Sequence, residues 1–318
     1  MEYRRLGRAG LKVSELSFGS WITFGSNLNL NTIRQCLQVA FDSGVNFFDN
    51  AEAYANGASE LMMGEAIKDF RREDLVISTK IFWGGKGPNS TGLSWKHLVE
   101  GTKGSLRRLQ LDYVDLLFCH RPDPNTPIEE TVRAMDAIVR AGHAFYWGTS
   151  EWCAEDIDAA HQIAHAINAI PPTMEQPEYN LFQRHRVEEE YQPLYLKYGM
   201  GATVWSPLES GILTGKYNDE IPPGSRLHRH EELRNRLTRE KILKVKALEN
   251  IAHELACTLP QLAIAWCLKN PNVSSVITGA SSISQLQENL GASQVKLQLN
   301  DDVMHAIEEI LHHQMAHA

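Results

Sequence analysis

Four residues of the sequence have side chains suited to proton chemistry: Asp49, Tyr54, Lys80 and His120. A tyrosine hydroxyl, with an ordinary pKa of about 10, is a weak proton donor near neutral pH unless its surroundings tune it. Lowering that pKa by about two or three units requires about 3–4 kcal/mol. An ammonium group at about 4 Å supplies this much at an effective dielectric constant of about 20. We therefore predict that Lys80 lowers the pKa of Tyr54.

Asp49 and His120 complete a coherent set with this pair. The Asp49 carboxylate would hold the Lys80 ammonium charged and oriented. His120 would donate a hydrogen bond to a substrate oxygen. Such a set suits proton delivery to a developing alkoxide, and hence the reduction of a carbonyl group.

Short apolar runs of strand character alternate along the chain with longer segments of helical periodicity. The expected strands are Leu16–Gly19, Asn46–Asp49, Leu75–Lys80, Val114–Cys119, Ala144–Thr149, Thr173–Glu175, Ala202–Trp205 and Ser275–Ile277. The expected helices include Thr32–Ser43, Ser59–Phe70, Trp95–Leu109, Glu129–Ala141, Glu155–Ile167, Glu188–Tyr198, Arg239–Leu255 and Ser284–Leu290. Eight such units predict a parallel sheet. The count, and the absence of a GxGxxG turn, favour its closure into a (β/α)8 barrel.

Three of the four candidate residues lie where an apolar strand ends. The C-terminal ends of barrel strands converge on one mouth, where catalytic groups lie. Each residue alone also has a structural interpretation: Asp49 as a helix cap or turn residue, Lys80 as a solvated strand end, His120 as a satisfied core or loop histidine, and Tyr54 as a ring covering a loop. Independent accidents do not explain why all four would gather at one mouth.

Three segments exceed the minimal barrel repeat. Tyr3–Glu15 is expected to form a hairpin that could plug the N-terminal end of the barrel. Pro207–Leu237 is rich in glycine, proline and charge and is too long for an ordinary barrel loop. Asp301–His313 is expected to be a C-terminal helix. No linker separates these segments, so we expect residues 1–318 to form one domain.

The composition narrows the class of partner. The formal charge of −8, from 31 Lys and Arg against 39 Asp and Glu, disfavours nucleic acid and anionic membranes as partners. No apolar run approaches the roughly 18 residues of a spanning helix, and no apolar signal region follows Met1. Five scattered cysteines without CxxC spacing favour a reducing compartment. We therefore expect a cytoplasmic protein without membrane insertion.

Two other chemistries fit parts of the sequence less well. A metal site would need ligand spacing that neither the adjacent pair Cys119 and His120 nor the tail histidines provide, so none is expected. These tail histidines are His305, His312, His313 and His317. Lys80 could instead form a Schiff base, as in a class I aldolase-type barrel. That alternative leaves Tyr54 without a role.

Longer stretches around these residues resemble the aldo-keto reductase family, and more closely its branch that contains the voltage-gated potassium-channel β-subunits. The resemblance covers essentially the whole chain. It rests on Gly19–Gly25, Phe48–Tyr54, Thr79–Lys86, Arg121–Pro127, Trp205–Leu208 and Leu259–Trp266. It implies a barrel that binds NADP(H) across its C-terminal mouth and reduces aldehydes and ketones, with Tyr54 as the proton donor.

The resemblance also implies a set of cofactor contacts. The nicotinamide end would meet Ser20, Trp21, Ser150, Gln176 and Trp205, with the indole of Trp205 stacked on the ring. The pyrophosphate would be wrapped by Ser206, Pro207, Leu208, Ser210, Lys216 and Arg226, which makes Pro207–Leu237 a cofactor strap. The adenosine end, with its 2′-phosphate, would meet Gly279, Ser281, Gln285, Glu288 and Asn289 near a helix N-terminus. Asn27 and Asp49 complete the expected set.

Some positions depart from the channel branch. That branch carries Asn where this chain has His120, so the histidine favours a working enzyme. Glu151 and Gly224 stand where the branch has Arg and Tyr. The alternative function is a cofactor-sensing regulatory protein, similar to a channel β-subunit, with incidental reductase activity. The branch further implies a homo-oligomer of four or more subunits, and donors at the adenosine end favour NADPH over NADH.

Overall fold

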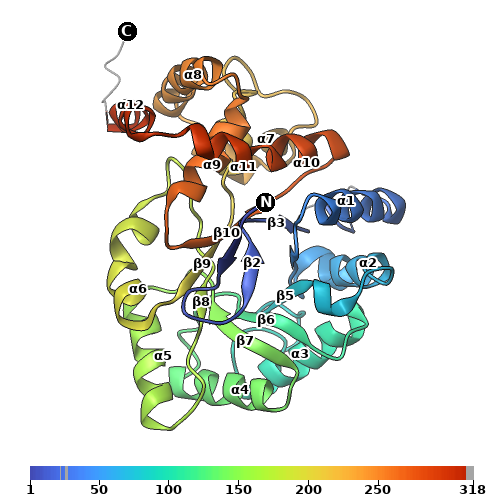
Figure 1. Ribbon diagram of the computed structural model, residues 1–318. Helices are drawn as coiled ribbons and strands as arrows, with labels where there is room; N and C mark the ends of the chain where they lie inside the picture. Colours follow the sequence, from blue (N-terminus) through green and yellow to red (C-terminus); the bar gives the residue numbers. More distant parts are fainter. Residues whose placement is uncertain (22, 26–27, 313–318) are drawn as a thin grey trace.

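The structure is a computed structural model that describes every residue of the chain except 22, 26–27 and 313–318 (Figure 1). Its centre is a closed barrel of eight parallel strands in the order β10-β3-β4-β5-β6-β7-β8-β9. The strands are β3 Leu16–Gly19, β4 Phe47–Asp49, β5 Val76–Ile81, β6 Val114–Cys119, β7 Ala144–Thr149, β8 Met174–Glu175, β9 Gly201–Val204 and β10 Val273–Thr278. All eight predicted strands are confirmed to within two residues at either end, and so is the (β/α)8 barrel.

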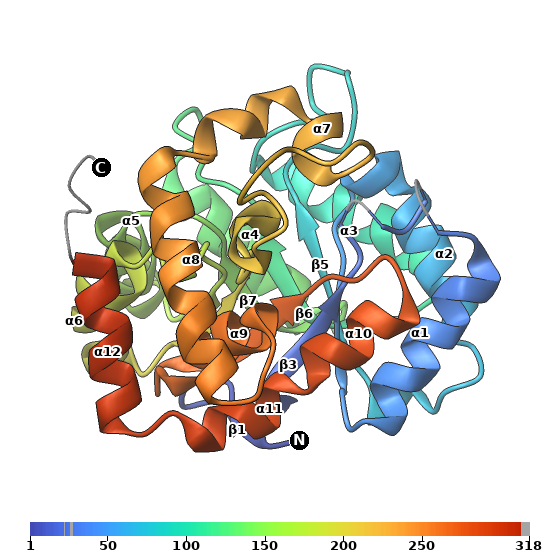
Figure 2. The same cartoon turned by 90° about the horizontal axis from the view of Figure 1, so that it is seen from above.

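Helices cover the outside of the barrel (Figures 1 and 2). They are α1 Leu30–Asp42, α2 Ala58–Ala66, α3 Trp95–Leu109, α4 Ile128–Arg140, α5 Ala154–Ala166, α6 Gln192–Tyr198, α7 Arg226–Arg229, α8 Arg239–Glu254, α9 Leu259–Lys269, α10 Ile283–Leu290, α11 Ala292–Val295 and α12 Asp301–His312. The strand–helix interface buries most of the apolar side chains of the described residues. This burial is the main favourable contribution to the stability of the barrel.

Three of these helices differ from the prediction. The expected helix Ser59–Phe70 ends at Ala66 as α2. The expected helix Glu188–Tyr198 begins instead at Gln192, after a π-helical turn. Pro193 explains the start, because proline lacks an N–H and is tolerated only in the first turn. Helix α9 was not among the expected helices because it is apolar on nearly all sides, so no helical period shows in its sequence. A capping box between Thr258 and Gln261 begins it.

The N-terminal hairpin is present and closes one end of the barrel. Strands β1 (Tyr3–Arg5) and β2 (Lys12–Ser14) pair antiparallel, and Figure 1 shows them lying across the barrel end. Leu6 and Val13 of the hairpin pack among the side chains that fill the barrel interior. The barrel side chains of that cluster are Phe47, Val76, Leu116, Phe118, Met174 and Ile277.

The register of the strands positions the opposite end of the barrel. Asp49 pairs with Ser78, and Lys80 pairs with Phe118, two residues before His120. The C-terminal ends of β4, β5 and β6 therefore lie side by side on the rim of the barrel. This register brings the polar residues of three strand ends to the same mouth.

The long segment Pro207–Leu237 is an irregular strap built of short turns. It contains 3-10 turns at Glu209–Thr214 and Glu231–Arg236, with α7 between them. Glu209, in the first of these turns, is fully buried, and its carboxylate accepts hydrogen bonds from Asn180 and Lys241. The strap is thus fastened by a buried ionic network beside the mouth.

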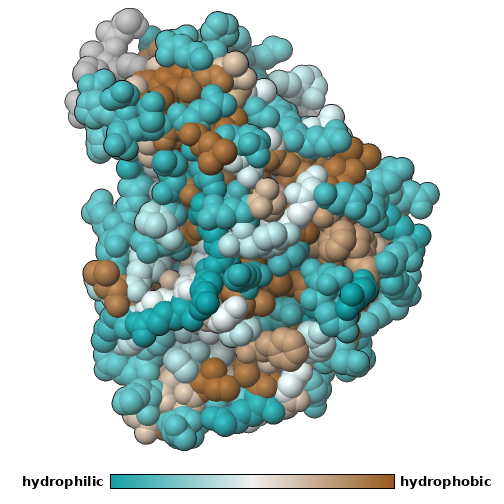
Figure 3. All heavy atoms as spheres, viewed as in Figure 1, coloured by the Kyte–Doolittle hydropathy of each residue, from teal (hydrophilic) through white to brown (hydrophobic). Residues whose placement is uncertain are grey.

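Helix α12 packs on α8 at the edge of the barrel. An ion pair of 2.7 Å between Arg184 and Glu308 fastens it. His313, the expected last residue of this helix, lies outside the described residues. Among the described residues, no single helix is long and apolar enough to cross a membrane. The bent pair α8 and α9, which meet at 89°, reaches that length and composition only when the two are taken together. Hydrophilic residues cover most of the face shown in Figure 3.

Candidate active site

A groove with a volume of about 1090 Å³ opens at the C-terminal end of the barrel. Its walls come from the strand ends, the strap, the end of α8 and the start of α10. Asp49, Tyr54 and His120 line it, and Lys80 lies buried beneath. The structure therefore brings the four predicted catalytic residues together.

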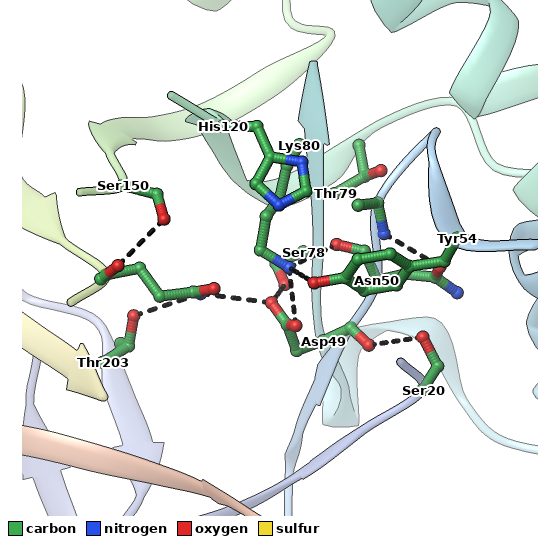
Figure 4. Close-up of polar contacts among 12 residues, drawn as sticks. Ser20, Asp49, Asn50, Tyr54, Ser78, Thr79, Lys80, His120, Ser150 and Thr203 are labelled. Carbon is green, nitrogen blue, oxygen red and sulfur yellow. Dashed lines mark hydrogen bonds and ion pairs between the residues drawn. The ribbon is translucent and has the colours of Figure 1, made fainter. Parts of the chain in front are cut away.

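The Lys80 ammonium is the centre of the site (Figure 4). Its Nζ lies 2.6 Å from Asp49 Oδ2, 2.7 Å from the Asn50 carbonyl oxygen and 3.0 Å from the Tyr54 hydroxyl. The side chain is fully buried. Burial alone would lower the pKa of Lys80, but Asp49 and Tyr54 together raise it above its ordinary value. Lys80 is therefore charged, with each of its three N–H donors satisfied.

Asp49 is held from its other side as well. Ser78 Oγ donates to Asp49 Oδ1 over 2.7 Å, and Gln176 Nε2 donates to the same oxygen over 3.2 Å. Ser20 is also fully buried, and its hydroxyl donates to the Asp49 backbone carbonyl over 2.9 Å (Figure 4). Ser20, predicted to line the cofactor end, thus supports Asp49 from behind.

Tyr54 reaches the site from a strained turn after β4. Ala55 and Asn56 both adopt left-handed backbone conformations, with φ of 48° and 52°, before Gly57 at 86°. Left-handed geometry costs a non-glycine residue roughly 1–2 kcal/mol. Such strain is typical of functional sites, where the surrounding structure enforces it. Here the turn points the Tyr54 hydroxyl at Lys80.

His120 lies beside Tyr54 at the end of β6, with the two ring centroids 5.8 Å apart. Burial, and then the charges of Lys80 and Arg121, hold the pKa of His120 well below its ordinary value. The imidazole is therefore neutral at physiological pH and carries one N–H to donate. Its Nδ1 has no partner among the described residues.

The predicted nicotinamide contacts border this centre. Ser150 and Gln176 line the groove, joined by a hydrogen bond of 2.9 Å from Ser150 Oγ to the Gln176 carbonyl. Trp205 lines it too, and its indole N–H donates to Glu151 over 3.0 Å. Trp21 packs edge-on against Trp205, with ring centroids 6.3 Å apart.

The predicted strap and adenosine residues also line the groove. On the strap these are Ser206, Pro207, Leu208, Ser210, Lys216 and Arg226. At the other end they are Gly279, Ser281, Gln285, Glu288 and Asn289. Ser282 caps α10 through its hydroxyl, and Ser281 Oγ donates to the Gln285 side chain over 2.8 Å. Asn27, the remaining predicted contact, lies outside the described residues.

Comparisons with known proteins agree with this geometry. The model of the Aldo/keto reductase family matches residues 15–312. The chain belongs to the aldo/keto reductase family. It is similar to a probable voltage-gated potassium channel subunit beta of Arabidopsis thaliana, with 57% identity over 317 residues, which cover 98% of this chain and 97% of the relative. A protein of the same name from Oryza sativa subsp. japonica is 55% identical, with the same coverage of both chains.

The net pKa of Tyr54 in this aldo/keto reductase differs from the prediction. Lys80 lowers the pKa of Tyr54, as predicted, but the pKa as a whole lies above its ordinary value. Burial, the largest effect, raises that pKa, Lys80 lowers it, and Asp49 raises it again. Burial, together with the Asp49 charge, outweighs the effect of the Lys80 ammonium, so the phenol keeps its proton at neutral pH. A protonated Tyr54 remains able to protonate a strongly basic alkoxide.

Trp83 and Arg121 are among the groove residues that sequence reasoning missed in this aldo/keto reductase. Trp83 is 43% exposed, and its ring centroid lies 5.0 Å from that of His120. Arg121 lines the groove directly after His120. Both occur in the stretches that carry the family resemblance, and both follow a polar strand end within three residues. The signal that could have found them is that each follows closely after a predicted catalytic residue, Trp83 after Lys80 and Arg121 after His120.

Proposed function

We propose that this aldo/keto reductase reduces aldehydes and ketones to alcohols with NADPH. The observation that carries the proposal is the buried Lys80 ammonium, which donates at once to Asp49 and to the Tyr54 hydroxyl at the base of the groove. Because the Tyr54 oxygen accepts from Lys80, its own O–H is free for a substrate oxygen. The neutral His120 lies close enough to donate to the same oxygen.

The groove residues fit a phosphate-bearing cofactor. Three buried polar atoms in or directly before the strap, Ser206 Oγ, Ser225 Oγ and Arg226 Nε, have no partner among the described residues. Buried polar groups without partners are rare, and donors of this kind suit phosphate oxygens. Burial lowers the pKa of Arg226 to about 10, which still leaves the guanidinium charged at neutral pH. When bound, NADPH would supply the hydride for the carbonyl carbon.

The protein residues would then hold the cofactor and serve the reaction. Trp205 and Gln176 would hold the nicotinamide end, the strap with Lys216 the pyrophosphate, and the start of α10 the adenosine end. Asp49 would keep Lys80 charged, Tyr54 would deliver the proton, and His120 would orient the carbonyl. Preorganised donors of this kind act where charge develops in the transition state.

We extend the proposal to the whole protein. Residues 1–318 would act as one domain, in the cytoplasm, as the scattered cysteines favour. The resemblance to the channel branch also leads us to propose a homo-oligomer of four or more subunits, which sedimentation analysis would test.

The test is consumption of NADPH by the purified protein with a panel of reactive carbonyl compounds that includes methylglyoxal and nitrobenzaldehydes. We expect turnover with several members of the panel and formation of the matching alcohol. Folded protein that turns over no member of the panel would contradict the proposal.

The names of the two relatives favour a second candidate function. In that case the groove would bind NADP(H) as a signal, the protein would regulate a channel, and reduction would be incidental. The rate of hydride transfer separates the two functions, since typical enzymes turn over at about 1–1000 per second.

A further inference from the structure

Arg121 places an uncompensated positive charge beside the proposed reaction centre. Its Nη1 donates over 2.6 Å to the His120 carbonyl and over 3.3 Å to Ser150 Oγ. Its Nε and Nη2 make no hydrogen bond within the described part of the chain, and no carboxylate there lies within ion-pair distance. Two N–H edges of the guanidinium thus remain available in a wall of the groove.

The neighbouring charges do not compensate it. The carboxylate of Asp49 is committed to Lys80. Glu52, on the turn that carries Tyr54, is committed to the Phe82 backbone N–H and to His97. An anion that entered the groove here would therefore face a free cation and no free carboxylate among these groups. An arginine fork binds a carboxylate through two parallel hydrogen bonds.

Trp83 shapes the same wall. Its exposed ring lies 5.0 Å from the His120 ring and 5.5 Å from the Arg121 guanidinium, measured to the Trp83 ring centroid. A flat substrate that rests on this indole would have one edge near His120 and another near Arg121.

We infer that the groove selects carbonyl compounds that carry a carboxylate, which Arg121 binds while the carbonyl meets Tyr54 and His120. The inference rests on the proposed reductase function and names its substrate class: aldehyde or keto acids, with planar aromatic acids fitting the Trp83 wall. Arg121 is in this account a specificity-determining residue. Arg121 also donates a hydrogen bond to Ser150. A test must therefore distinguish an effect on the position of Ser150 from an effect on the carboxylate of the substrate.

The test compares 4-carboxybenzaldehyde with methyl 4-formylbenzoate, which has a similar shape and no charge. We expect wild-type kcat/KM to favour the acid by about tenfold to a hundredfold, the range of a hydrogen bond to a charged group. Arg121→Met should abolish this preference and bring the ratio of kcat/KM for the acid to kcat/KM for the ester to about one. Arg121→Lys should keep part of the preference, because it keeps the charge and loses the fork.

Arg133→Met is the matched control, since Arg133 is an exposed residue of α4 that pairs with Glu129 and lies outside the groove. It should leave the acid-to-ester ratio unchanged. This inference alone would be overturned if the wild type reduced the ester as well as the acid. It would also be overturned if Arg121→Met lowered kcat/KM by the same factor for both substrates. Failure to reduce either compound would overturn the proposed function with it.

Discussion

At the residue scale, the site depends on how Lys80 distributes its three hydrogen bonds. One goes to Asp49, one to the Asn50 carbonyl and one to the Tyr54 hydroxyl. A buried ammonium without these partners would cost several kcal/mol of stability. The charged pair therefore fixes the phenol in place and leaves its O–H free to donate.

Tyr54→Phe tests the role of that O–H. We expect kcat to fall by about 10²–10⁴-fold, the usual contribution of a general acid. The dissociation constant of NADPH should stay within about twofold, because the hydroxyl bonds only to Lys80 among the described residues. Fluorescence titration and steady-state kinetics measure the two quantities.

Tyr3→Phe is the control for this substitution, because the Tyr3 hydroxyl donates to the Gly44 carbonyl on the exposed hairpin side. Tyr3→Phe should change neither kcat nor the dissociation constant of NADPH. A Tyr54→Phe protein that keeps a tenth of wild-type kcat would assign the proton to another donor.

The positions of the four site residues were predictable from the sequence because three of them end apolar strands. The direction of the Tyr54 pKa was not predictable, since it depends on burial and on the Asp49 charge as well as on Lys80. The free guanidinium edges of Arg121 were likewise invisible, because the partners of a surface-type residue do not show in its neighbours along the chain.

At the element scale, Glu151 connects three loops around the groove. It adopts a left-handed conformation, with φ of 61°, two residues after the end of β7. Its carboxylate accepts from Trp205 Nε1 at 3.0 Å and from the Glu178 backbone N–H at 2.6 Å. Glu178 in turn binds Arg236 of the strap through both carboxylate oxygens. Glu151 thus orients the Trp205 indole and joins it to the strap.

Glu151→Ala should weaken NADPH binding by about tenfold, the value of one or two lost hydrogen bonds. Glu151→Gln should restore most of the affinity, because its amide oxygen still accepts from Trp205. In a Trp205→Phe background, Glu151→Ala should weaken NADPH binding little further, since Glu151 and Trp205 act through the hydrogen bond that joins them. Fluorescence titration of the four proteins measures this coupling, and independent, additive losses would refute it.

Strand β8 carries the fully buried carboxyl group of Glu175. Burial, the largest effect, raises the pKa of Glu175 to about 8, although a hydrogen bond from Thr149 lowers it and the Glu151 charge raises it further. The folded state therefore binds a proton that the unfolded state releases near pH 4.5. Stability from this group is present below about pH 4.5 and is lost as the pH rises through about 8.

Glu175→Gln removes this titration. The stability of the wild type relative to Glu175→Gln should fall by a few kcal/mol between about pH 5 and about pH 9. Urea unfolding across that range measures it, with Glu189→Gln as the control at an exposed glutamate. Parallel stability curves for wild type and Glu175→Gln would show that the buried carboxyl does not titrate in this range.

The elements themselves were predictable to different degrees. Buried parallel strands read as continuous apolar runs, so all eight were found. Helix α9 escaped because a helix that is apolar all round has no period to detect. The turn that presents Tyr54 also escaped. Asn56 and Gly57 tolerate a left-handed backbone, but nothing in the sequence indicates that Ala55 adopts one.

At the scale of the whole molecule, an acidic protein carries a groove with cationic walls. The net charge is −8, yet Arg121, Lys216 and Arg226 all face the groove. Such a local field attracts anionic ligands without affecting the rest of the surface. A cofactor with one more phosphate should therefore bind more tightly.

NADPH should raise the melting temperature more than NADH at equal concentration. A ligand at about 100 times its dissociation constant stabilises a protein by about 2.7 kcal/mol, which corresponds to a shift of several degrees. Ser281→Ala combined with Gln285→Ala should narrow the difference between the two cofactors. Equal shifts with NADPH and NADH in the wild type would contradict the assignment of the 2′-phosphate site.

The most direct test of the proposed reductase is a single-turnover measurement of hydride transfer. Protein saturated with NADPH is mixed rapidly with an excess of a reactive aldehyde, and the loss of nicotinamide absorbance is followed. The account predicts a first-order decay at about one per second or faster, with formation of the alcohol. Decay slower than about one per minute with every aldehyde would contradict it and favour the cofactor-sensing function.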